Sequence, residues 1–436
     1  MTNSTKNIST VNTLLRNKNR VLNHLNLQKS KVNVIHMLGF NENNSQWTQN
    51  QQLLSSMMDG SSSVGQAVQE ISARNRLDCT KVRELLTGLY TTGLLEFHIT
   101  DVCDLSCIEC HYRAKSLSTF PFDSISTFIT ALNPKAITIT GGGEPSLYNN
   151  THKTMNDVIR LIVETFPNKN IGLINNNTHI PEGDWIDYIK WQRSSLDAAN
   201  RETYRYIKGV DKYDVTIENI YCLLASNIQF VGVGFLYRDE NIEQIPLFLE
   251  QWFERYQHMT VYAQAKFNIQ FRPISPAIES IADYDLHNDL EIRMYKSVCK
   301  TTARARVNLA FDKFLRMQTN FFAIGNNKNG SYFLHDQQEF SHCQNALLHR
   351  ILRSDGTEYP DFLICNHPKM ALGNVLTANN PDDERIRISL NTLFYYFRMS
   401  EFCDTAHCRQ CWVSQLVEEY SSKDISSLDL PDLAFF

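Results

Sequence analysis

Apolar positions recur at helical spacing in the first hundred residues of this chain. From Lys31 a short strand-like run, KVNVIHML, precedes three stretches with a helical apolar period, at residues 53–58, 64–71 and 82–89. The pattern predicts a compact, mostly helical unit over residues 31–93. Residues 1–30 are rich in Asn, Ser and Lys with only a weak apolar period, so they are expected to form a flexible arm.

The pattern changes at Leu94. Six short apolar runs then alternate with longer helical stretches: LLEFHIT, AITIT, NIGLIN, WQRSSL, VGVGFL and FNIQF. Because parallel strands need crossover connections, this alternation predicts a parallel α/β architecture over residues 94–275. Its functional side chains should lie at the carboxyl ends of the strands. Residues 276–340 are predicted to form a mostly helical connection, and residues 341–436 a small Cys-rich domain.

Charge and hydropathy narrow the class of protein. The chain carries 42 basic and 47 acidic side chains, a net charge of −5, which argues against a nucleic-acid partner. No run approaches the ~20 apolar residues of a membrane span, and the N-terminus shows no apolar signal core. We therefore expect a cytoplasmic protein with no membrane partner.

The eleven cysteines are an odd number in a chain without an export signal, so we expect metal binding rather than disulfides. Cys103-x3-Cys107-x2-Cys110 directly follows the first predicted strand. Three thiolates at this spacing can hold three irons of a cubane cluster and leave the fourth iron open to a cofactor. The alternative is a zinc site with His111 as the fourth ligand.

The second predicted strand, AITIT, leads into Gly141-Gly142-Gly143-Glu144-Pro145. Glycines let the backbone approach a ligand closely, and a carboxylate there can bind an ammonium group. One βα unit after the cysteine loop, this element resembles the radical S-adenosylmethionine (SAM) superfamily, over about residues 94–275. The resemblance implies a partial (β/α)6 TIM-type barrel.

The resemblance also implies roles for particular residues. Cys103, Cys107 and Cys110 would bind a 4Fe-4S cluster whose open iron chelates SAM. The SAM contacts would be Gly142, Gly143, Glu144, Asn176, Arg193 and Ser195, with Gln270 and Arg272 as further pocket residues. The position before the third cysteine, usually aromatic in the family, is Glu109 here, which puts the packing of the adenine in doubt.

The second cysteine set is similar to the SPASM/twitch domains that append an auxiliary cluster to such barrels. Cys343, Cys365, Cys408 and Cys411 would then hold a second 4Fe-4S cluster. Two alternatives remain open: a structural zinc ion on the same thiols, or Cys403 or Cys343 kept free as a hydrogen-atom donor.

The order of elements over residues 31–93 resembles the winged-helix element that binds leader peptides in maturases of ribosomally made peptides, where a leader adds a strand to a sheet edge. A plain helical cap on the barrel is the alternative. The resemblances together imply an enzyme that cleaves SAM reductively to a 5′-deoxyadenosyl radical and abstracts hydrogen from a precursor peptide. Epimerisation, a thioether or a C–C crosslink would follow.

The expected partners are the precursor peptide and a flavodoxin- or ferredoxin-type electron donor. The first alternative is a radical SAM dehydrogenase or lyase that acts on a small molecule such as an aminosugar or nucleoside. An alternative of another class is a non-catalytic Fe–S or zinc scaffold.

Overall fold

The computed structural model describes residues 26–42, 45–108, 110, 117–167, 170–274, 290, 293–294, 296–297, 300–301, 308–320, 342, 344–360 and 371–398. Cys103, Cys107 and Cys110 are among them. The second cysteine set, Cys343, Cys365, Cys403, Cys408 and Cys411, lies outside the described residues. The auxiliary cluster and the hydrogen-atom donor therefore stay predictions.

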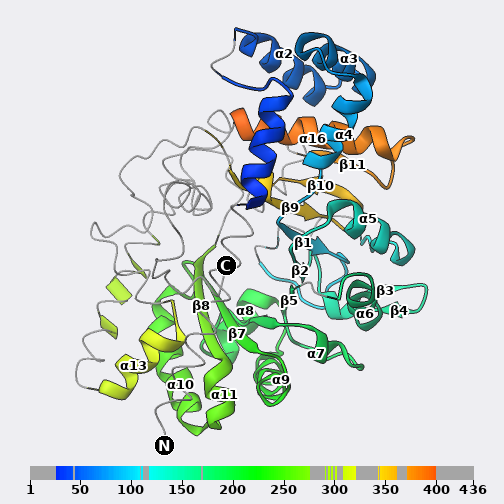
Figure 1. Cartoon of the computed structure of the whole chain (residues 1–436). Coiled ribbons are helices and arrows are strands. Elements are labelled where there is room, and N and C mark those ends of the chain that lie inside the picture. The colour runs from blue at the N-terminus through cyan, green and yellow to red at the C-terminus, as the bar shows by residue number, and fades with distance from the viewer. Residues whose placement is uncertain are drawn as a thin grey trace, which may run out of the picture.

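A parallel sheet forms the centre of the molecule and contains all six predicted strands (Figure 1). Each strand pairs in parallel with the next along the chain. The strands are β1 (Leu94–His98), β2 (Ala136–Thr140), β5 (Asn170–Asn175), β6 (Trp191–Ser195), β7 (Phe230–Tyr237) and β8 (Phe267–Pro273). The predicted α/β fold with a partial barrel of parallel strands is confirmed.

Helices alternate with these strands and cover one face of the sheet (Figure 1). They are α5 (Ile125–Leu132), α6 (Met155–Thr165), α7 (Trp185–Tyr188), α8 (Arg201–Lys208), α9 (Tyr213–Ala225), α10 (Ile245–His258) and α11 (Val261–Lys266), with α13 (Leu309–Gln318) after β8. A two-stranded ribbon, β3 (Asn149–Asn150) with β4 (Lys153–Thr154), precedes α6. Among the described residues, no helix has both the length and the apolar character that crossing a bilayer requires.

The two faces of the sheet differ in character because strand side chains alternate. Phe235 of β7 packs edge to face on Phe248 of α10, with ring centroids 4.7 Å apart. Its neighbours Gly232 and Gly234 lie on the opposite face, where the side chain of Arg193 from β6 runs past them. We call this second face, turned away from the helices, the interior face.

The sheet continues beyond β1 with three strands that the sequence pattern does not reveal. β9 (His349–Leu352) pairs in parallel with β1, and β10 (Thr357–Tyr359) and β11 (Gly373–Asn374) follow in antiparallel fashion. Helix α15 (Gln344–Leu348) leads into β9. The described part of residues 341–436 is thus continuous with the barrel sheet, and β1 lies in its interior rather than at its edge.

The strand expected at residues 31–38 is wrong, because residues 26–37 form a helix. Ile35 and Leu38 are buried on the same side as Lys31, which is a helical and not an alternating period. The described residues between 26 and 93 contain no strand, since the three elements that follow are also helices. They are α2 (Trp47–Met58), α3 (Val64–Asn75) and α4 (Cys79–Leu89). The sheet edge on which winged-helix leader binding depends is therefore absent from this described part.

The N-terminal helices and the C-terminal helix α16 (Pro381–Arg398) form one layer at an end of the molecule (Figure 1). Helices α2, α3 and α4 all contact α16, and they share one apolar core with the barrel. Lys31 adds a polar link, because its buried ammonium donates to the carbonyl oxygens of Leu89 (2.9 Å) and Leu347 (2.7 Å). Burial lowers the pKa of Lys31 well below its ordinary value, and Arg350 lowers it further.

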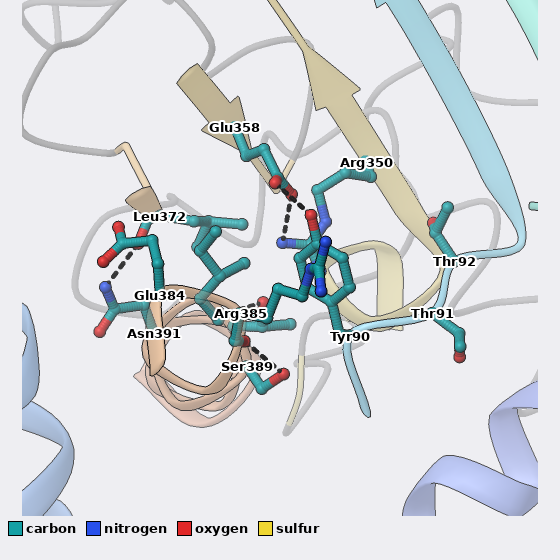
Figure 2. A network of polar contacts seen from close by, with 12 residues as sticks. Tyr90, Thr91, Thr92, Arg350, Glu358, Leu372, Glu384, Arg385, Ser389 and Asn391 are labelled. Atoms are coloured by element: carbon teal, nitrogen blue, oxygen red, sulfur yellow. Dashed lines mark hydrogen bonds and ion pairs between the residues drawn. The ribbon is translucent and has the colours of Figure 1, made fainter. Parts of the chain in front are cut away.

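A buried polar network joins this helical layer to the added strands (Figure 2). The Tyr90 hydroxyl, just after α4, donates to Glu358 of β10 at 2.5 Å, and Arg350 of β9 lies 3.6 Å from the other carboxylate oxygen. Burial raises the pKa of Glu358 to about 7, although Arg350 and Tyr90 both act to lower it. Asn391 of α16 donates to the carbonyl of Leu372 at 2.7 Å.

Replacing Tyr90 with Phe is expected to lower the free energy of unfolding by about 1–3 kcal/mol, because buried Glu358 loses its hydroxyl donor. Tyr188→Phe is the matched control, since the Tyr188 hydroxyl donates to Asp184 (3.0 Å) at a partly exposed position. The control should change stability by no more than about 0.5 kcal/mol. Urea unfolding of both variants measures the difference, and equal losses would contradict the importance assigned to the buried bond.

Candidate active site

The first cysteine set lies on the loop that follows β1, at the carboxyl end of the parallel strands, as predicted. Cys103 is exposed, whereas Cys107 and Cys110 are half-buried, and the backbone N–H of Cys110 donates to the Cys107 carbonyl at 3.3 Å. Although Cys103 is exposed as a residue, partial loss of hydration around its thiol, together with the nearby Glu144 and Asp104 carboxylates, raises its pKa to about 12. Burial also raises the pKa of Cys107. The positive charge of a bound metal is what would deprotonate such thiols.

The three thiols of this loop suit the iron–sulfur cluster that the sequence predicts. Among the described residues, no group of three His, Cys, Asp or Glu side chains converges closely enough to hold one metal ion. A four-iron cubane does not need such convergence, because each thiolate binds a different iron. Glu109 and His111, the latter required by the zinc alternative, lie outside the described residues.

The glycine element after β2 is locked to the start of the cysteine loop. Gly143 N–H donates to the Thr100 carbonyl at 3.0 Å, and Glu144 N–H donates to the Val102 carbonyl at 2.7 Å. A Cβ atom on Gly143 would lie only 2.2 Å from the Val102 carbonyl oxygen. Glycine is therefore required here by the close approach of two backbones, and this contact fixes the two motifs relative to each other.

Glu144 is buried beside the end of β5. Its carboxylate accepts the backbone N–H of Asn176 at 2.6 Å and that of Ser146 at 3.1 Å. Burial raises the pKa of Glu144 to about 7, while the two backbone donors act to lower it. Each carboxylate oxygen has a second lone pair, so the group can also accept from an ammonium ligand.

Two asparagines at the end of β5 complete this side of the site. The Asn176 amide lies 4.0 Å from Cys103 Sγ and donates to Asp104 at 2.8 Å. Asn177 adopts a left-handed backbone with φ of +58° and is buried. Within the described residues its amide oxygen and nitrogen have no hydrogen-bond partner.

Asp104, directly after Cys103, is a functional residue that the sequence patterns missed. Besides Asn176, it accepts from the Thr178 hydroxyl at 2.6 Å and from the Lys212 ammonium at 3.0 Å. Burial acts to raise the pKa of Asp104, but these donors outweigh it and hold the pKa below its ordinary value. Asp104 thus anchors the cysteine loop to β5 and to the start of α9. The only sequence signal for Asp104 is its place next to Cys103, a predicted cluster ligand.

The end of α8 supports the other side of the loop and was also missed. Ser106 N–H donates to the Lys208 carbonyl at 2.9 Å, and Ile108 N–H donates to the Ile207 carbonyl at 3.0 Å. Gly209 ends the helix with φ of +75°, and a Cβ atom there would lie 2.7 Å from the Ser106 carbonyl oxygen. The sequence alone could not reveal this support, because a Lys-Gly pair is common at the ends of helices.

Arg193 and Ser195, predicted on β6, both lie on the interior face but in different surroundings. Arg193 donates to Gln270 of β8, and its pKa is lowered by burial and by the neighbouring Arg272. The Ser195 hydroxyl donates instead to Asp197 at 3.2 Å. The structure therefore brings Arg193, Gln270 and Arg272 together on one interior surface.

Glu96 and His98 of β1 also face the interior, where their side chains lie 3.0 Å apart. Neither was singled out from the sequence, because both fall within an ordinary strand pattern. Burial acts to raise the pKa of Glu96, but His98, His349 and Arg193 hold it below its ordinary value. The interior surface therefore carries two arginines, two histidines and this carboxylate.

Comparison with known proteins gives partial matches. No family model matches the chain. A probable GTP 3′,8-cyclase of Saccharolobus islandicus is 24% identical over 166 residues, covering 36% of this chain and 51% of the relative. The corresponding protein of Saccharolobus solfataricus is 24% identical over 161 residues with the same coverage. The chain thus spans about half the length (51%) of the curated relatives it matches.

Solved structures with a similar arrangement are more distant. SuiB of Streptococcus suis, bound to the precursor peptide SuiA, has a TM-score of 0.47 at 13% identity, covering 72% of this chain and 69% of that chain. The enzyme anSMEcpe, with bound AdoMet and a Cp18Cys peptide, has a TM-score of 0.49 at 15% identity, covering 76% and 97%. Such likenesses carry neither a reaction nor a substrate over to this chain.

The cysteine loop, the glycine–glutamate element locked to it and the parallel barrel all agree with the resemblance to radical SAM proteins that the motifs predicted. The curated matches make the chain similar, over part of its length, to proteins named as GTP 3′,8-cyclases.

Proposed function

We propose that this protein binds a 4Fe-4S cluster and SAM at the carboxyl ends of β1 and β2, and cleaves SAM reductively to abstract a hydrogen atom from its substrate. The observation that carries the proposal is the pair of backbone hydrogen bonds from Gly143 and Glu144 to the residues just before Cys103. They hold a carboxylate suited to the SAM ammonium beside the cluster-binding loop.

The residues have distinct tasks in this proposal. Cys103, Cys107 and Cys110 hold the cluster, which when bound supplies the electron that cleaves SAM. Glu144 accepts from the SAM ammonium, and Gly142 lets the ligand approach the backbone. Gly143 lets the backbone of the cysteine loop pack against the glycine element. Asn176 holds Glu144 and Asp104 in place, while Arg193 and Ser195 face the ligand from β6.

As substrate we propose a ribosomal precursor peptide, with epimerisation, a thioether or a C–C crosslink as the outcome. The support is the second cysteine set, Cys343, Cys365, Cys408 and Cys411, which resembles the auxiliary-cluster domains of peptide-modifying relatives. A flavodoxin- or ferredoxin-type protein would supply the electron. Cys403 or Cys343 would supply a hydrogen atom if the product is an epimer.

A small-molecule substrate is the second candidate, and two observations favour it. The curated relatives are named as GTP 3′,8-cyclases. The interior face carries Arg193 and Arg272 side by side, a placement suited to a phosphate or carboxylate group.

Deuterium transfer distinguishes the two substrate classes even while the substrate itself is unidentified. The reduced, reconstituted protein is incubated with SAM and either a uniformly deuterated peptide extract or deuterated GTP and other nucleosides. The proposal predicts that 5′-deoxyadenosine gains deuterium from the peptide extract alone. Deuterium gained only from a nucleoside or nucleotide would contradict the peptide proposal and support the second candidate.

Leader-peptide binding has to be measured on the full chain. Deleting residues 1–90 would strip α2, α3 and α4 from α16 and expose its apolar face to water. It would also remove Lys31, which links this layer to α15, and Tyr90, which links it to β10. Loss of activity after such a deletion would therefore reflect damaged structure as much as lost peptide binding.

A further inference from the structure

The chain enters and leaves the cysteine loop at one place. Two backbone hydrogen bonds join the two sides: Asp101 N–H donates to the Ser118 carbonyl at 2.8 Å, and Phe120 N–H donates to the Ile99 carbonyl at 2.9 Å. We call the two paired segments, residues 99–102 and 118–120, the loop neck. Because Cys103 follows the loop neck directly, the loop neck determines where the cysteine loop begins.

The loop neck also carries the glycine element. The carbonyl of Thr100 accepts the N–H of Gly143 at 3.0 Å, and the carbonyl of Val102 accepts the N–H of Glu144 at 2.7 Å. A shift of the loop neck would therefore move Cys103 and Glu144 relative to each other. Whatever holds the loop neck in place also holds both motifs of the site.

The turn between β9 and β10, residues 353–356, lies against the loop neck. Strand β9 pairs in parallel with β1, so the carboxyl ends of both strands lie at the same edge of the sheet (Figure 1). The Ser118 hydroxyl donates to the Asp101 carboxylate at 2.8 Å. Since a serine hydroxyl has only one hydrogen, the Ser354 hydroxyl must be the donor in its 2.6 Å contact with Ser118. A chain of hydrogen bonds thus runs from the turn to Asp101.

Arg353 adds a charge to this contact. Its guanidinium lies 3.7 Å from the carboxylate oxygen of Asp101 that Ser118 also reaches, and the two side chains are only 4% and 3% exposed. Among the described residues, the other carboxylate oxygen of Asp101 has no hydrogen-bond partner. A buried carboxylate is costly unless it is paired and hydrogen-bonded. The position of Asp101 is therefore tied to the turn.

The turn is itself held firmly. Arg353 N–H donates to the Thr357 carbonyl, and Gly356 N–H donates to the Arg353 carbonyl, both at 2.9 Å. Gly356 adopts φ of +84°, which favours glycine. The Asn374 amide of β11 donates to the Asp355 carbonyl at 2.9 Å. These contacts lie within the C-terminal strands, so the turn can act as a fixed support for the loop neck.

We propose that Arg353 and Ser354 are positioning residues for the candidate active site, which hold the loop neck through Asp101 and Ser118. The C-terminal strands would then take part in SAM cleavage, although none of the cluster ligands predicted on the cysteine loop belongs to them. The inference rests on the proposed binding of a cluster and SAM at this loop. It concerns only the placement of the loop and includes no bond-making step.

The first measurement is hydrogen–deuterium exchange of the full-length chain before iron is added, in the peptides that contain the N–H groups of Asp101, Phe120 and Gly143. In the double variant Arg353→Met with Ser354→Ala these groups should exchange about tenfold faster, because Asp101 loses the charge and the relay that hold it. After reconstitution, this variant should bind as much iron as the wild type. It should form 5′-deoxyadenosine about 10- to 100-fold more slowly, because the loop is displaced.

Two variants serve as controls. Arg353→Lys retains both the charge and Ser354, so it should stay near the wild type in exchange and in SAM cleavage. Tyr90→Phe removes a buried hydrogen bond to β10 without touching the loop neck, so it destabilises the same strands and should leave both measurements unchanged. If the double variant does not fold, Ser354→Ala replaces it, with smaller changes expected in the same directions.

Unchanged exchange at the loop neck in the folded variant would overturn the proposal. So would faster exchange with an unchanged rate of SAM cleavage, or equal effects of Tyr90→Phe. Loss of iron from both the double variant and Ser354→Ala would also overturn it, because the two residues would then act only in building the site. A wild-type chain that takes up no iron would instead contradict the proposed function itself, and the exchange measured before iron is added tells the two failures apart.

Discussion

Replacing Cys103, Cys107 and Cys110 together with Ala is expected to lower the iron of the anaerobically reconstituted protein by about four atoms per chain. The three thiols are the only cysteines in the sequence between β1 and β2. Wild-type protein should hold about eight irons if the C-terminal cysteines bind a second cluster, and about four if they do not. Iron and labile sulfide assays on both proteins give the answer.

The matched control is the double variant Cys79→Ala with Cys222→Ala. Both residues are exposed and belong to helices α4 and α9 rather than to the cysteine loop. This variant should retain the iron of the wild type. If the triple variant also retains it, the cluster is not on the predicted loop.

Replacing Gly143 with Ala is expected to have the second-largest effect. The added Cβ would meet the Val102 carbonyl oxygen at 2.2 Å and the Asp101 carbonyl carbon at 2.4 Å, both backbone atoms that lead into the cysteine loop. Relief of the clash should cost about 1–3 kcal/mol of stability. A displacement of about 1 Å at the loop is enough to lower the rate of SAM cleavage about 100-fold.

Gly88→Ala provides the control for this substitution. Gly88 lies in α4, and a Cβ there has no neighbouring atom within 4 Å. Because Ala has the higher helix propensity, this variant should be neutral or more stable by up to about 1 kcal/mol. If Gly143→Ala and Gly88→Ala had similar iron content and similar rates of SAM cleavage, the Gly143 contact would not determine the geometry of the site.

The barrel was predictable because its signals are local. Runs such as AITIT and VGVGFL are bounded by helical stretches, and parallel pairing then brings their carboxyl ends together. The resemblance to radical SAM proteins selected Glu144, Asn176 and the cysteine loop, the strand rule placed them at one edge of the sheet, and the structure brings them together. Strands β9, β10 and β11 are two to four residues long and form by pairing in series, β9 with β1, β10 with β9 and β11 with β10, so no local pattern marks them.

Other features depend on contacts that no local pattern records. Part of the helix at residues 26–37 resembles a strand in sequence, because β-branched Val32, Val34 and Ile35 follow Lys31. It is specified by acceptors at Leu89 and Leu347, far along the chain. Lys208 and Lys212 likewise look like ordinary surface lysines until the fold brings them to Asp197 and Asp104.

The most direct test of the proposed function is the formation of 5′-deoxyadenosine from SAM by the reconstituted protein under anaerobic conditions, with dithionite as the reductant. We expect the wild type to form 5′-deoxyadenosine and methionine only when reductant is present. The variant lacking Cys103, Cys107 and Cys110 should form none above the level without protein. Fully iron-loaded wild-type protein that cleaves no SAM under reducing conditions would contradict the proposed function, and would favour a non-catalytic iron–sulfur scaffold.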